Sequence, residues 1–328
     1  MYIHTYIQRH KQGEKEMGDL THTAASSVTT TRTVLTEELQ KRFIEYIDAR
    51  PQSLIAYGKG LKCMFSYFMT AGITSPRRED MMHYRDQLKA KYAPTTTALY
   101  LTAARLFFKW TAQEGLYPNI AEHVKGATLD RAHRKGYFTS AAIKNIIGTA
   151  DRDTATGKRD YAILALMTTG GLRCIEVTRA NIEDLTIQGD STILFVQGKG
   201  KDERTDYVKI PEKTEKAIRD YLATRGEVKP SDPLFVCRGN RNAQGRLTTR
   251  SISRICKDHF KAAGYNDRRL TAHSLRHTAA TLAILAGATL IEAQEHLRHA
   301  SPETTMIYIN ETNRAANSSA AKIADTIF

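Results

Sequence analysis

Apolar residues recur at helical spacing from Leu35 to about Lys125, and this periodicity limits the fold of that region more than any other sequence feature. The repeat is carried by Leu39, Phe43, Ile44 and Ile47, then by Leu61, Met64, Phe65 and Phe68, and then by Leu99, Leu101, Leu106, Phe107 and Trp110. Such spacing places the apolar side chains on one face of each helix, where they need a partner helix. We therefore predict a small all-helical domain over residues 35–125. Residues 1–34 are polar and rich in Ser and Thr, so we expect a tail there.

The rest of the chain shows a change of period. Residues 126–136 are basic and weakly periodic, which predicts a linker before a second domain over residues 137–310. Helical spacing gives way once within that domain, in STILFVQGKGKDERTDYVKI (191–210), where β-branched and aromatic runs flank a Gly-Lys-Gly-Lys turn. This pattern predicts a β-hairpin. The expected fold class is therefore mainly α with one small β-sheet, and residues 311–328 are expected to form a C-terminal tail.

The chain is strongly basic, with a net charge of +13 and a pI near 9.5. This balance favours a nucleic acid, an acidic partner or an anionic membrane surface. No apolar run approaches the roughly 20 residues that span a bilayer, and the N-terminal segment has no apolar core like that of a signal peptide. We therefore expect a cytoplasmic protein with no membrane partner. The helical domain and the linker contain the basic residues that we expect to contact DNA: Lys59, Lys62, Arg105, Lys109, Arg131, Arg134 and Lys135.

Cationic side chains gather around an alanine- and leucine-rich helical run in residues 271–310. They are His273, Arg276, His277, His296, Arg298 and His299, and Tyr308 follows them. Buried cations cost free energy unless something compensates them, and the unpaired N–H groups of a helix start favour an anion. A metal site is the alternative, because two of the histidine pairs have helical spacing. Arg276 lies within the first pair and would repel a divalent cation, so we expect an anion site and no metal.

Two more cationic positions precede this run. Arg173 follows two glycines and has Glu176 three residues later, whereas Lys199 lies in the predicted hairpin turn. Taken alone, the first is an ordinary surface ion pair and the second is a solvated lysine. The joint order is more informative: Arg-x-x-Glu, a Gly-Lys-Gly hairpin, His-x-x-Arg, a further His and a late Tyr.

This ordered set resembles the catalytic residues of the tyrosine site-specific recombinases, and the resemblance is closest to the Xer-like and transposon integrase branch. The matching segments are GLRCIE, GKGKDER, HSLRH, LRHAS and TTMIY. The resemblance implies a catalytic set made up of Arg173, Lys199, His273, Arg276, His299 and the nucleophile Tyr308, with Glu176 supporting it. Arg298 stands where the family commonly has glycine, which implies a different local turn. Lys201 lies on the same hairpin turn as Lys199, and we prefer Lys199 as the acid and keep Lys201 as a DNA-binding candidate.

The resemblance also implies an all-helical core-binding domain followed by a mixed α/β catalytic domain. It implies a recombinase that cuts and rejoins double-stranded DNA through a 3′-phosphotyrosyl intermediate, without ATP, metal or another cofactor. Holding two duplexes implies a tetramer of protomers on DNA, associated with the nucleoid. The tail over residues 311–328 would dock on a neighbouring protomer or pack on its own domain. Two alternatives remain open: a catalytically silent DNA-binding regulator of the same fold, and a topoisomerase-like enzyme that relaxes DNA.

Overall fold

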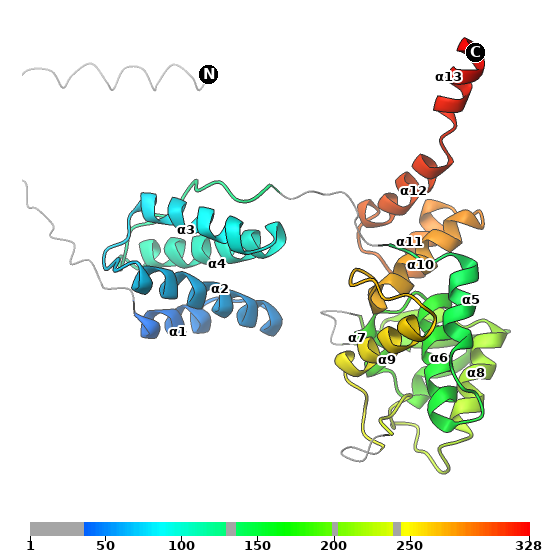
Figure 1. Cartoon of the computed structure of the whole chain (residues 1–328). Coiled ribbons are helices and arrows are strands. Elements are labelled where there is room, and N and C mark those ends of the chain that lie inside the picture. Colours follow the sequence, from blue (N-terminus) through cyan, green and yellow to red (C-terminus); the bar gives the residue numbers. More distant parts are fainter. Residues whose placement is uncertain (1–35, 129–135, 199–202, 239–243) are drawn as a thin grey trace, which may run out of the picture. The chain divides into compact units, whose positions relative to one another are not determined.

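The structure, a computed structural model, describes residues 36–128, 136–198, 203–238 and 244–328 (Figure 1). The chain divides into two compact units, one within residues 1–130 and the other within residues 131–328. Most described residues are helical, and a small three-stranded antiparallel sheet lies in the second unit. The predicted fold class is therefore confirmed. No helix in the described part of the chain has the length and apolar character needed to cross a bilayer.

The first unit is built from helices α1 (Glu37–Tyr46), α2 (Pro51–Thr70), α3 (Arg78–Lys91) and α4 (Pro94–Gln113). Proline occupies the first turn of α2 and of α4, where its missing N–H costs nothing. The apolar stripes meet in an aromatic core in which Phe107 contacts both Phe43 and Phe65 edge to face, with ring centroids 5.5 Å apart in each pair. Most of the apolar positions predicted from the helical period lie in this core, but Leu99 of α4 is exposed.

The second unit contains the remaining helices. They are α5 (Ser140–Gly148), α6 (Ala155–Thr169), α7 (Cys174–Arg179), α8 (Glu212–Leu222), α9 (Thr249–Ala262), α10 (Ala272–Leu285), α11 (Leu290–Leu297), α12 (Glu303–Ala316) and α13 (Ser319–Ile327), with a 3₁₀ turn at Ile182–Asp184. The central helix is α6, which is buried over nearly its whole length and packs against α8 and α10. Because α6 ends at Thr169, the Gly170-Gly171 turn follows it and lies against α10 and the end of α11.

The sheet consists of β1 (Leu185–Gln188), β2 (Ser191–Val196) and β3 (Asp206–Lys209), in the order β1-β2-β3. The predicted hairpin is the β2–β3 pair, in which Val196 lies opposite Asp206. The sequence did not predict β1, which pairs with β2 from Leu185 opposite Leu194. This strand is short and half exposed, so it carries no run of apolar residues that would mark it.

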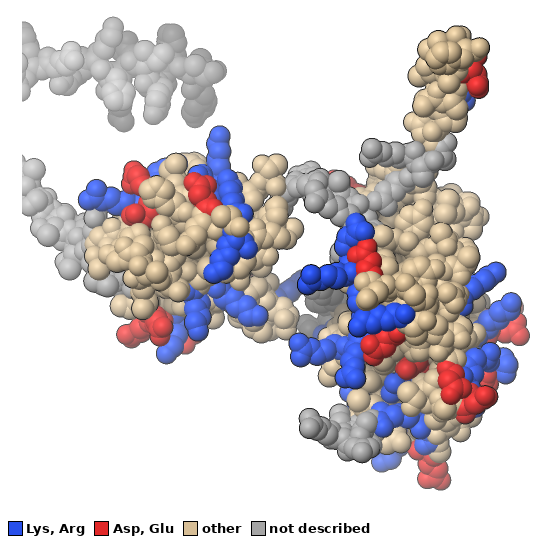
Figure 2. All heavy atoms as spheres, in the orientation of Figure 1, with Lys and Arg blue, Asp and Glu red and all other residues tan. Residues whose placement is uncertain are grey.

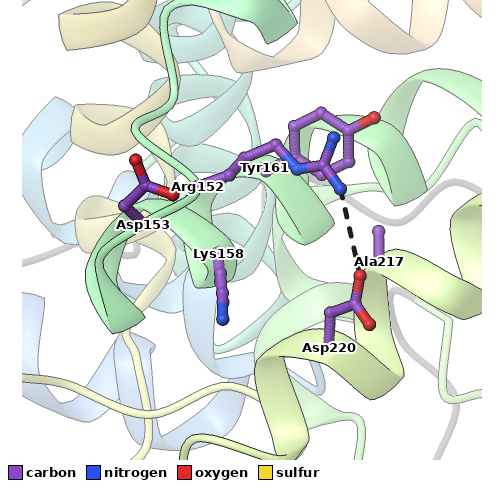
Figure 3. A pocket seen from close by; sticks show the side chains of 6 residues that line it. All are labelled: Arg152, Asp153, Lys158, Tyr161, Ala217 and Asp220. Carbon is purple, nitrogen blue, oxygen red and sulfur yellow. Dashed lines mark ion pairs between the residues drawn. The ribbon is translucent and has the colours of Figure 1, made fainter.

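A surface hollow of about 450 Å³ lies where the turn before α6 meets α8 (Figure 3). Arg152 stacks over the ring of Tyr161, 4.6 Å from its centroid, and one of its nitrogens lies 3.9 Å from a carboxylate oxygen of Asp220. Exposed pairs of this kind contribute little to stability. We interpret the cluster as a surface contact between α6 and α8.

Helix α13 stands clear of the other helices in Figure 1, and it has no buried residue. Its apolar side chains are strongly exposed, with Ile323 at 58%, Ile327 at 67% and Phe328 fully open to solvent. An amphipathic helix with a bare apolar face is not stable alone in water and requires a surface to cover it.

Candidate active site

Arg276 lies at the centre of a cluster of charged side chains in the second unit. It comes from the first turns of α10 and is only 1% exposed, although its guanidinium is charged. The guanidinium donates hydrogen bonds to the carbonyl oxygens of Gly171 and Leu297. Burial, together with the nearby charge of Arg173, lowers the pKa of Arg276 to about 9 against the opposing effect of Glu176. Arg276 therefore stays charged at neutral pH and joins the end of α6 to the end of α11.

Glu176 supplies the buried negative charge of this cluster. Its carboxylate is 1% exposed and accepts hydrogen bonds from the backbone N–H of Arg173 at 2.9 Å and from the Arg173 guanidinium at 2.7 Å. Arg276 Nη1 lies 4.0 Å from the same carboxylate. Burial by itself would raise the pKa of Glu176, but Arg298, the Arg173 N–H and Arg276 outweigh it and lower the pKa. The predicted surface ion pair between Arg173 and Glu176 is therefore a largely buried interaction.

Arg298 is the third arginine of the cluster. It follows the last residue of α11 with a left-handed backbone, at φ 54° and ψ 48°, and its side chain is only 7% exposed. This conformation costs a residue with a Cβ roughly 1–2 kcal/mol. The guanidinium donates to the carbonyls of His296 at 2.7 Å and Gly170 at 3.3 Å, and to Glu176 Oε2 at 3.0 Å. We expected the arginine to change this turn, but the backbone has the left-handed conformation that a glycine favours, and these bonds connect its side chain to the surrounding segments.

Tyr308 comes from the second turn of α12 and is only 3% exposed. Its ring packs with Ala280 of α10 and Leu297 of α11, which fixes its direction. Its hydroxyl forms a hydrogen bond with Nδ1 of His277, a buried side chain of α10. The phenol is therefore held beside the arginine cluster, near enough for its charge to act on Arg276.

His299 lies between the arginines and Tyr308. Its ring stacks nearly parallel to the Tyr308 ring, with centroids 6.5 Å apart, and its Nδ1 lies 2.8 Å from the Thr305 hydroxyl. Burial, followed by the charges of Arg276, Arg173 and Arg298, lowers the pKa of His299 to about 4. The imidazole is therefore neutral at pH 7. When the Thr305 hydroxyl donates to Nδ1, the remaining proton is on Nε2, which is then a hydrogen-bond donor.

We expect His299 to resist protonation far below the usual range of a histidine. Because its folded pKa is about 4 and the unfolded value is near 6.5, the unfolded chain binds a proton first as the pH falls. The contribution of His299 to the free energy of unfolding is therefore fully present above about pH 6.5 and is lost progressively towards pH 4. Nitrogen NMR shifts of the labelled imidazole measure this pKa, and a His299→Gln variant should lack the corresponding part of the pH dependence of unfolding. An imidazole that titrates near pH 6.5 in the folded protein would contradict this assignment.

Two arginines hold the ends of the hairpin loop beside this cluster. Arg179 donates to the Gly198 carbonyl at 3.2 Å, and Arg204 pairs with Asp184 at 3.2 Å while donating to the Arg179 carbonyl at the same distance. The two expected hairpin lysines, Lys199 and Lys201, lie outside the described residues. The structure therefore describes both ends of the loop that carries them.

The structure brings most of the expected catalytic set together. Arg173, Glu176, Arg276, His299 and Tyr308 are linked through the contacts described above. His273 is exposed near the start of α10, and its ring contacts the ring of His277 edge to face with centroids 4.5 Å apart. Within the described residues, no group of three or more His, Cys, Asp or Glu side chains is arranged to hold a metal ion.

The expected DNA-contacting residues have different surroundings. Lys59, Lys62 and Lys109 are exposed on the first unit, whereas Arg105 is half-buried and donates to the Val124 carbonyl. Figure 2 shows other Lys and Arg side chains on the visible face of both units. Three further candidates, Arg131, Arg134 and Lys135, lie outside the described residues. Because Arg105 donates a hydrogen bond to the Val124 carbonyl, its guanidinium is at least partly occupied within its own unit.

Two residues of the cluster, His277 and Arg298, were expected only as members of the cationic set in residues 271–310, and neither was expected in the catalytic set. His277 follows Arg276 directly on the same helix, and Arg298 stands where the family commonly has glycine. A signal was present for Arg298, because a long cationic side chain at a position that favours glycine needs a compensating contact. The partner of that contact was not visible in the local sequence.

Two protein-family models match the chain. The model described as "Phage integrase family" matches residues 137–314, and the model described as "Phage integrase, N-terminal SAM-like domain" matches residues 41–115. Together they cover both compact units. The residues of the arginine cluster and Tyr308 all lie within the first of these matches.

The chain is also similar in sequence to named recombinases and similar in fold to solved structures. The chain is 34% identical to tyrosine recombinase XerC of Thermodesulfovibrio yellowstonii, over 67% of this chain and 72% of that protein. It is 30% identical to tyrosine recombinase XerA of Pyrococcus furiosus, over 85% of this chain and 91% of that one. In fold it is similar to XerH recombinase bound to difH substrate after cleavage, with a TM-score of 0.72, 20% identity, and 88% and 84% coverage of the two chains. A lambda integrase dimer bound to a core site gives a TM-score of 0.66 at 16% identity, with 85% and 78% coverage.

Proposed function

This chain belongs to the phage integrase family of tyrosine recombinases, and we propose that it cuts and rejoins double-stranded DNA at a specific site through Tyr308. The observation that supports this most directly is the buried Tyr308 hydroxyl beside a cluster of three arginines and a neutral histidine. A phosphodiester is anionic, and such a cluster offers it charge and hydrogen-bond donors together. The membership places this protein among enzymes that break and rejoin DNA strands.

The proposed reaction is an in-line substitution at phosphorus. The Tyr308 oxygen forms a bond to phosphorus, the bond from phosphorus to the 5′ oxygen breaks, and a 3′-phosphotyrosyl enzyme and a 5′ hydroxyl result. The phenol proton passes to a histidine, for which we propose His273, while Lys199 gives a proton to the leaving 5′ oxygen. The new bond conserves the free energy of the old one, so the reverse attack by a 5′ hydroxyl rejoins DNA without ATP, metal or another cofactor.

The charged groups of the site match the charge that develops in this reaction. Arg173 is 29% exposed and Arg276 is buried beside it, so we propose that they contact the two non-bridging oxygens. His299 is neutral at pH 7, and we propose that it donates a further hydrogen bond to the phosphate from Nε2 while Nδ1 is bonded to Thr305. A neutral donor keeps its N–H at every pH well above 4, whereas a solvated histidine near pH 6.5 would titrate in the working range.

We propose that both units contact the duplex and that protomers assemble as a tetramer on two DNA sites. Related structures include a lambda integrase dimer on its core site and XerH on its difH substrate. The exposed Lys59, Lys62 and Lys109 and the basic linker, residues 126–136, are the proposed phosphate contacts. The exposed apolar face of α13 supports docking of residues 311–328 on a neighbouring protomer. We also propose that the protein acts in the cytoplasm, associated with the nucleoid, because its proposed substrate is DNA.

The function is tested by incubating the purified full-length protein with two DNA fragments of different length that carry the sequences flanking its own gene. Samples are denatured in detergent and separated, so that protein-bound DNA and new fragment lengths are both visible. A parallel supercoiled plasmid with the same sequence reports relaxation. We expect a covalent adduct and fragments of recombinant length.

The other outcomes separate the alternatives. An adduct with relaxed plasmid but no recombinant fragments would replace the proposal with a topoisomerase-like activity. The same incubation is repeated with DNA that carries a nick near the cleavage site, so that a cleaved end cannot rejoin. Tight binding to this DNA without an adduct would indicate a catalytically silent regulator instead. Either result would contradict site-specific strand exchange by this protein.

A further inference from the structure

The three arginines around Glu176 lie at different distances from its carboxylate. Glu176 is 1% exposed, and the nearest cation from another element is Arg298, whose Nη2 lies 3.0 Å from Oε2. Arg276, from α10, lies 4.0 Å away. Arg173 is closer, at 2.7 Å, but it belongs to the same turn as Glu176 and is the most exposed of the three arginines. Across the packed elements, Arg298 is therefore the main counter-charge of this carboxylate.

Arg298 also joins the segments on which the site is built. Its guanidinium donates to the carbonyls of Gly170 and Gly171, which lie between α6 and Arg173. The same group donates to the His296 carbonyl, three residues before His299. The Gly171 carbonyl also accepts a hydrogen bond from Arg276. One side chain thus links the segment before Arg173, the partner carbonyl of Arg276 and the turn that carries His299.

The backbone at Arg298 indicates that this side chain has a specific role. A left-handed conformation favours glycine and disfavours a residue with a Cβ, yet an arginine occupies it here at φ 54°. The backbone hydrogen bonds that close this turn, such as that from the His299 N–H to the Gln294 carbonyl at 3.1 Å, would form with glycine as well. What the arginine adds is the contact of its guanidinium with Glu176 and with the carbonyls of the site.

We propose that Arg298 is a positioning residue for DNA cleavage, whose guanidinium pairs with Glu176 and fixes this carboxylate where it holds Arg173 and Arg276 for the phosphate. This inference rests on the proposed function. It assigns no contact between Arg298 and DNA, because both Nη atoms are already used by carbonyl and carboxylate oxygens. In this chain a side chain supports the turn that a glycine would form without one.

Other titratable groups near Arg298 enter the design of the test. Glu176 is faced by Arg173 of its own turn, Arg276 of α10 and Arg298 after α11, whereas Arg298 is also within reach of Asp206 of β3. Burial, followed by the charges of Arg298 and Arg276, lowers the pKa of His296. Burial, followed by the charges of Arg276, Arg173 and Arg298, lowers the pKa of His299. Removing Arg298 should therefore raise the pKa of both histidines, and it also removes a cation from beside Glu176. The test must separate these two effects.

The test measures single-turnover cleavage of a nicked DNA substrate against pH for the wild type and for Arg298→Gly, Arg298→Met and Arg298→Lys. We expect the glycine and methionine variants to cleave about 10–100-fold more slowly at neutral pH, because small displacements of positioned groups have effects of this size. In these two variants, the fall of the cleavage rate at low pH should occur at a higher pH than in the wild type, because Glu176 then protonates more easily. In Arg298→Lys this fall should return most of the way to its wild-type pH. Arg269→Met, which removes an exposed charge paired with Asp267, should behave as the wild type.

A second measurement assigns the pH effect to Glu176. The free energy of unfolding is measured against pH for the wild type and Arg298→Met, and for the same pair in a Glu176→Gln background. A carboxyl with a lowered folded pKa gives stability that is present above its unfolded pKa and is lost as the pH falls towards the folded pKa. The unfolded pKa is the same in both proteins and the folded pKa of Glu176 is less lowered in Arg298→Met, so the acid-dependent loss should be smaller in that variant and should end at higher pH. In the Glu176→Gln background this difference should disappear. This measurement needs no catalytic activity.

The results that would contradict this inference differ from those that would contradict the proposed function. If the wild type cleaves DNA and Arg298→Gly or Arg298→Met cleaves at the same rate with the same pH profile, Arg298 is not a positioning residue. A pH difference that persists in the Glu176→Gln background would assign the effect to the histidines and would also overturn the inference. Weaker DNA binding with a reduced salt dependence in Arg298→Met would make Arg298 a phosphate contact instead. If the wild type forms no adduct while it binds DNA, the proposed function fails first.

Discussion

Replacing Tyr308 with phenylalanine should abolish the covalent protein–DNA adduct completely while leaving the protein folded and able to bind DNA. The substitution removes only the hydroxyl oxygen, which is the atom proposed to attack phosphorus. The ring is 3% exposed and packs with Ala280 and Leu297, so it keeps its apolar contacts. The hydrogen bond to His277 is lost, and such a bond contributes about 1 kcal/mol to stability. We therefore expect no cleavage at any time and a small change in melting temperature.

The measurement is a denaturing gel with labelled, nicked DNA, followed by mass spectrometry of the peptide that contains residue 308. Tyr221→Phe is the matched control, because Tyr221 is also fully buried in the second unit and its hydroxyl accepts a hydrogen bond from the Val236 N–H at 3.2 Å. This control should form the adduct as the wild type does. An adduct that persists in Tyr308→Phe, or that maps to another residue, would show that the nucleophile has been assigned wrongly.

Replacing Arg276 with lysine should lower the cleavage rate by on the order of 10²–10³-fold, although the positive charge is retained. Lysine is a compact point charge, whereas the planar guanidinium donates to two carbonyls and still faces Glu176. The lysine cannot make all three interactions, so the phosphate loses a positioned donor. We expect the single-turnover rate constant to fall much more than the affinity for DNA, because the lost contact acts mainly on the transition state.

The stability of Arg276→Lys must be measured beside its rate, because Arg276 is also part of the core. Leaving the Leu297 carbonyl without a donor costs about 1–3 kcal/mol, whereas the Gly171 carbonyl still accepts a hydrogen bond from Arg298. Arg159→Lys is the matched control, because Arg159 is a buried arginine that donates to the Val236 carbonyl at 3.1 Å and pairs with Asp160 at 2.8 Å. It should lose stability and keep its cleavage rate. If both variants lose cleavage to the same extent at a temperature where both are folded, Arg276 has no special role in catalysis.

The dominant effect at this site is the compensation of buried charge. A buried arginine or glutamate without a partner would be strongly destabilising, and removing one member of such a group leaves the others uncompensated. Glu176 is a single carboxylate beside Arg173, Arg276 and Arg298, so the cluster keeps excess positive charge. In the proposed reaction, the phosphate supplies a negative charge to this cluster. We therefore expect the substrate to bind where the charges of the protein are least balanced.

Parts of this arrangement were predictable because they depend on residues close together in the chain. The helix starts at Thr139 and Thr289 follow from capping residues, and the structure confirms the capping box between Thr289 and Glu292. The β2–β3 hairpin follows from apolar runs on either side of a glycine-rich turn. Strand β1 was missed because its pairing with β2 depends on the sheet and not on its own period.

The sequence by itself determined the two-part helical fold, the small hairpin and the order of the candidate catalytic residues, because helix period, turn chemistry and motif spacing are local properties. Only the tertiary structure decided which charges meet. Arg298 reaches Glu176 across 122 residues of sequence, and His277 reaches Tyr308 across 31. These contacts exist because α10, α11 and the turn after α6 pack together and exclude water, which forces each buried charge to find a partner. No local pattern contains that packing, so the supporting roles of Arg298 and His277 became visible only in the folded chain.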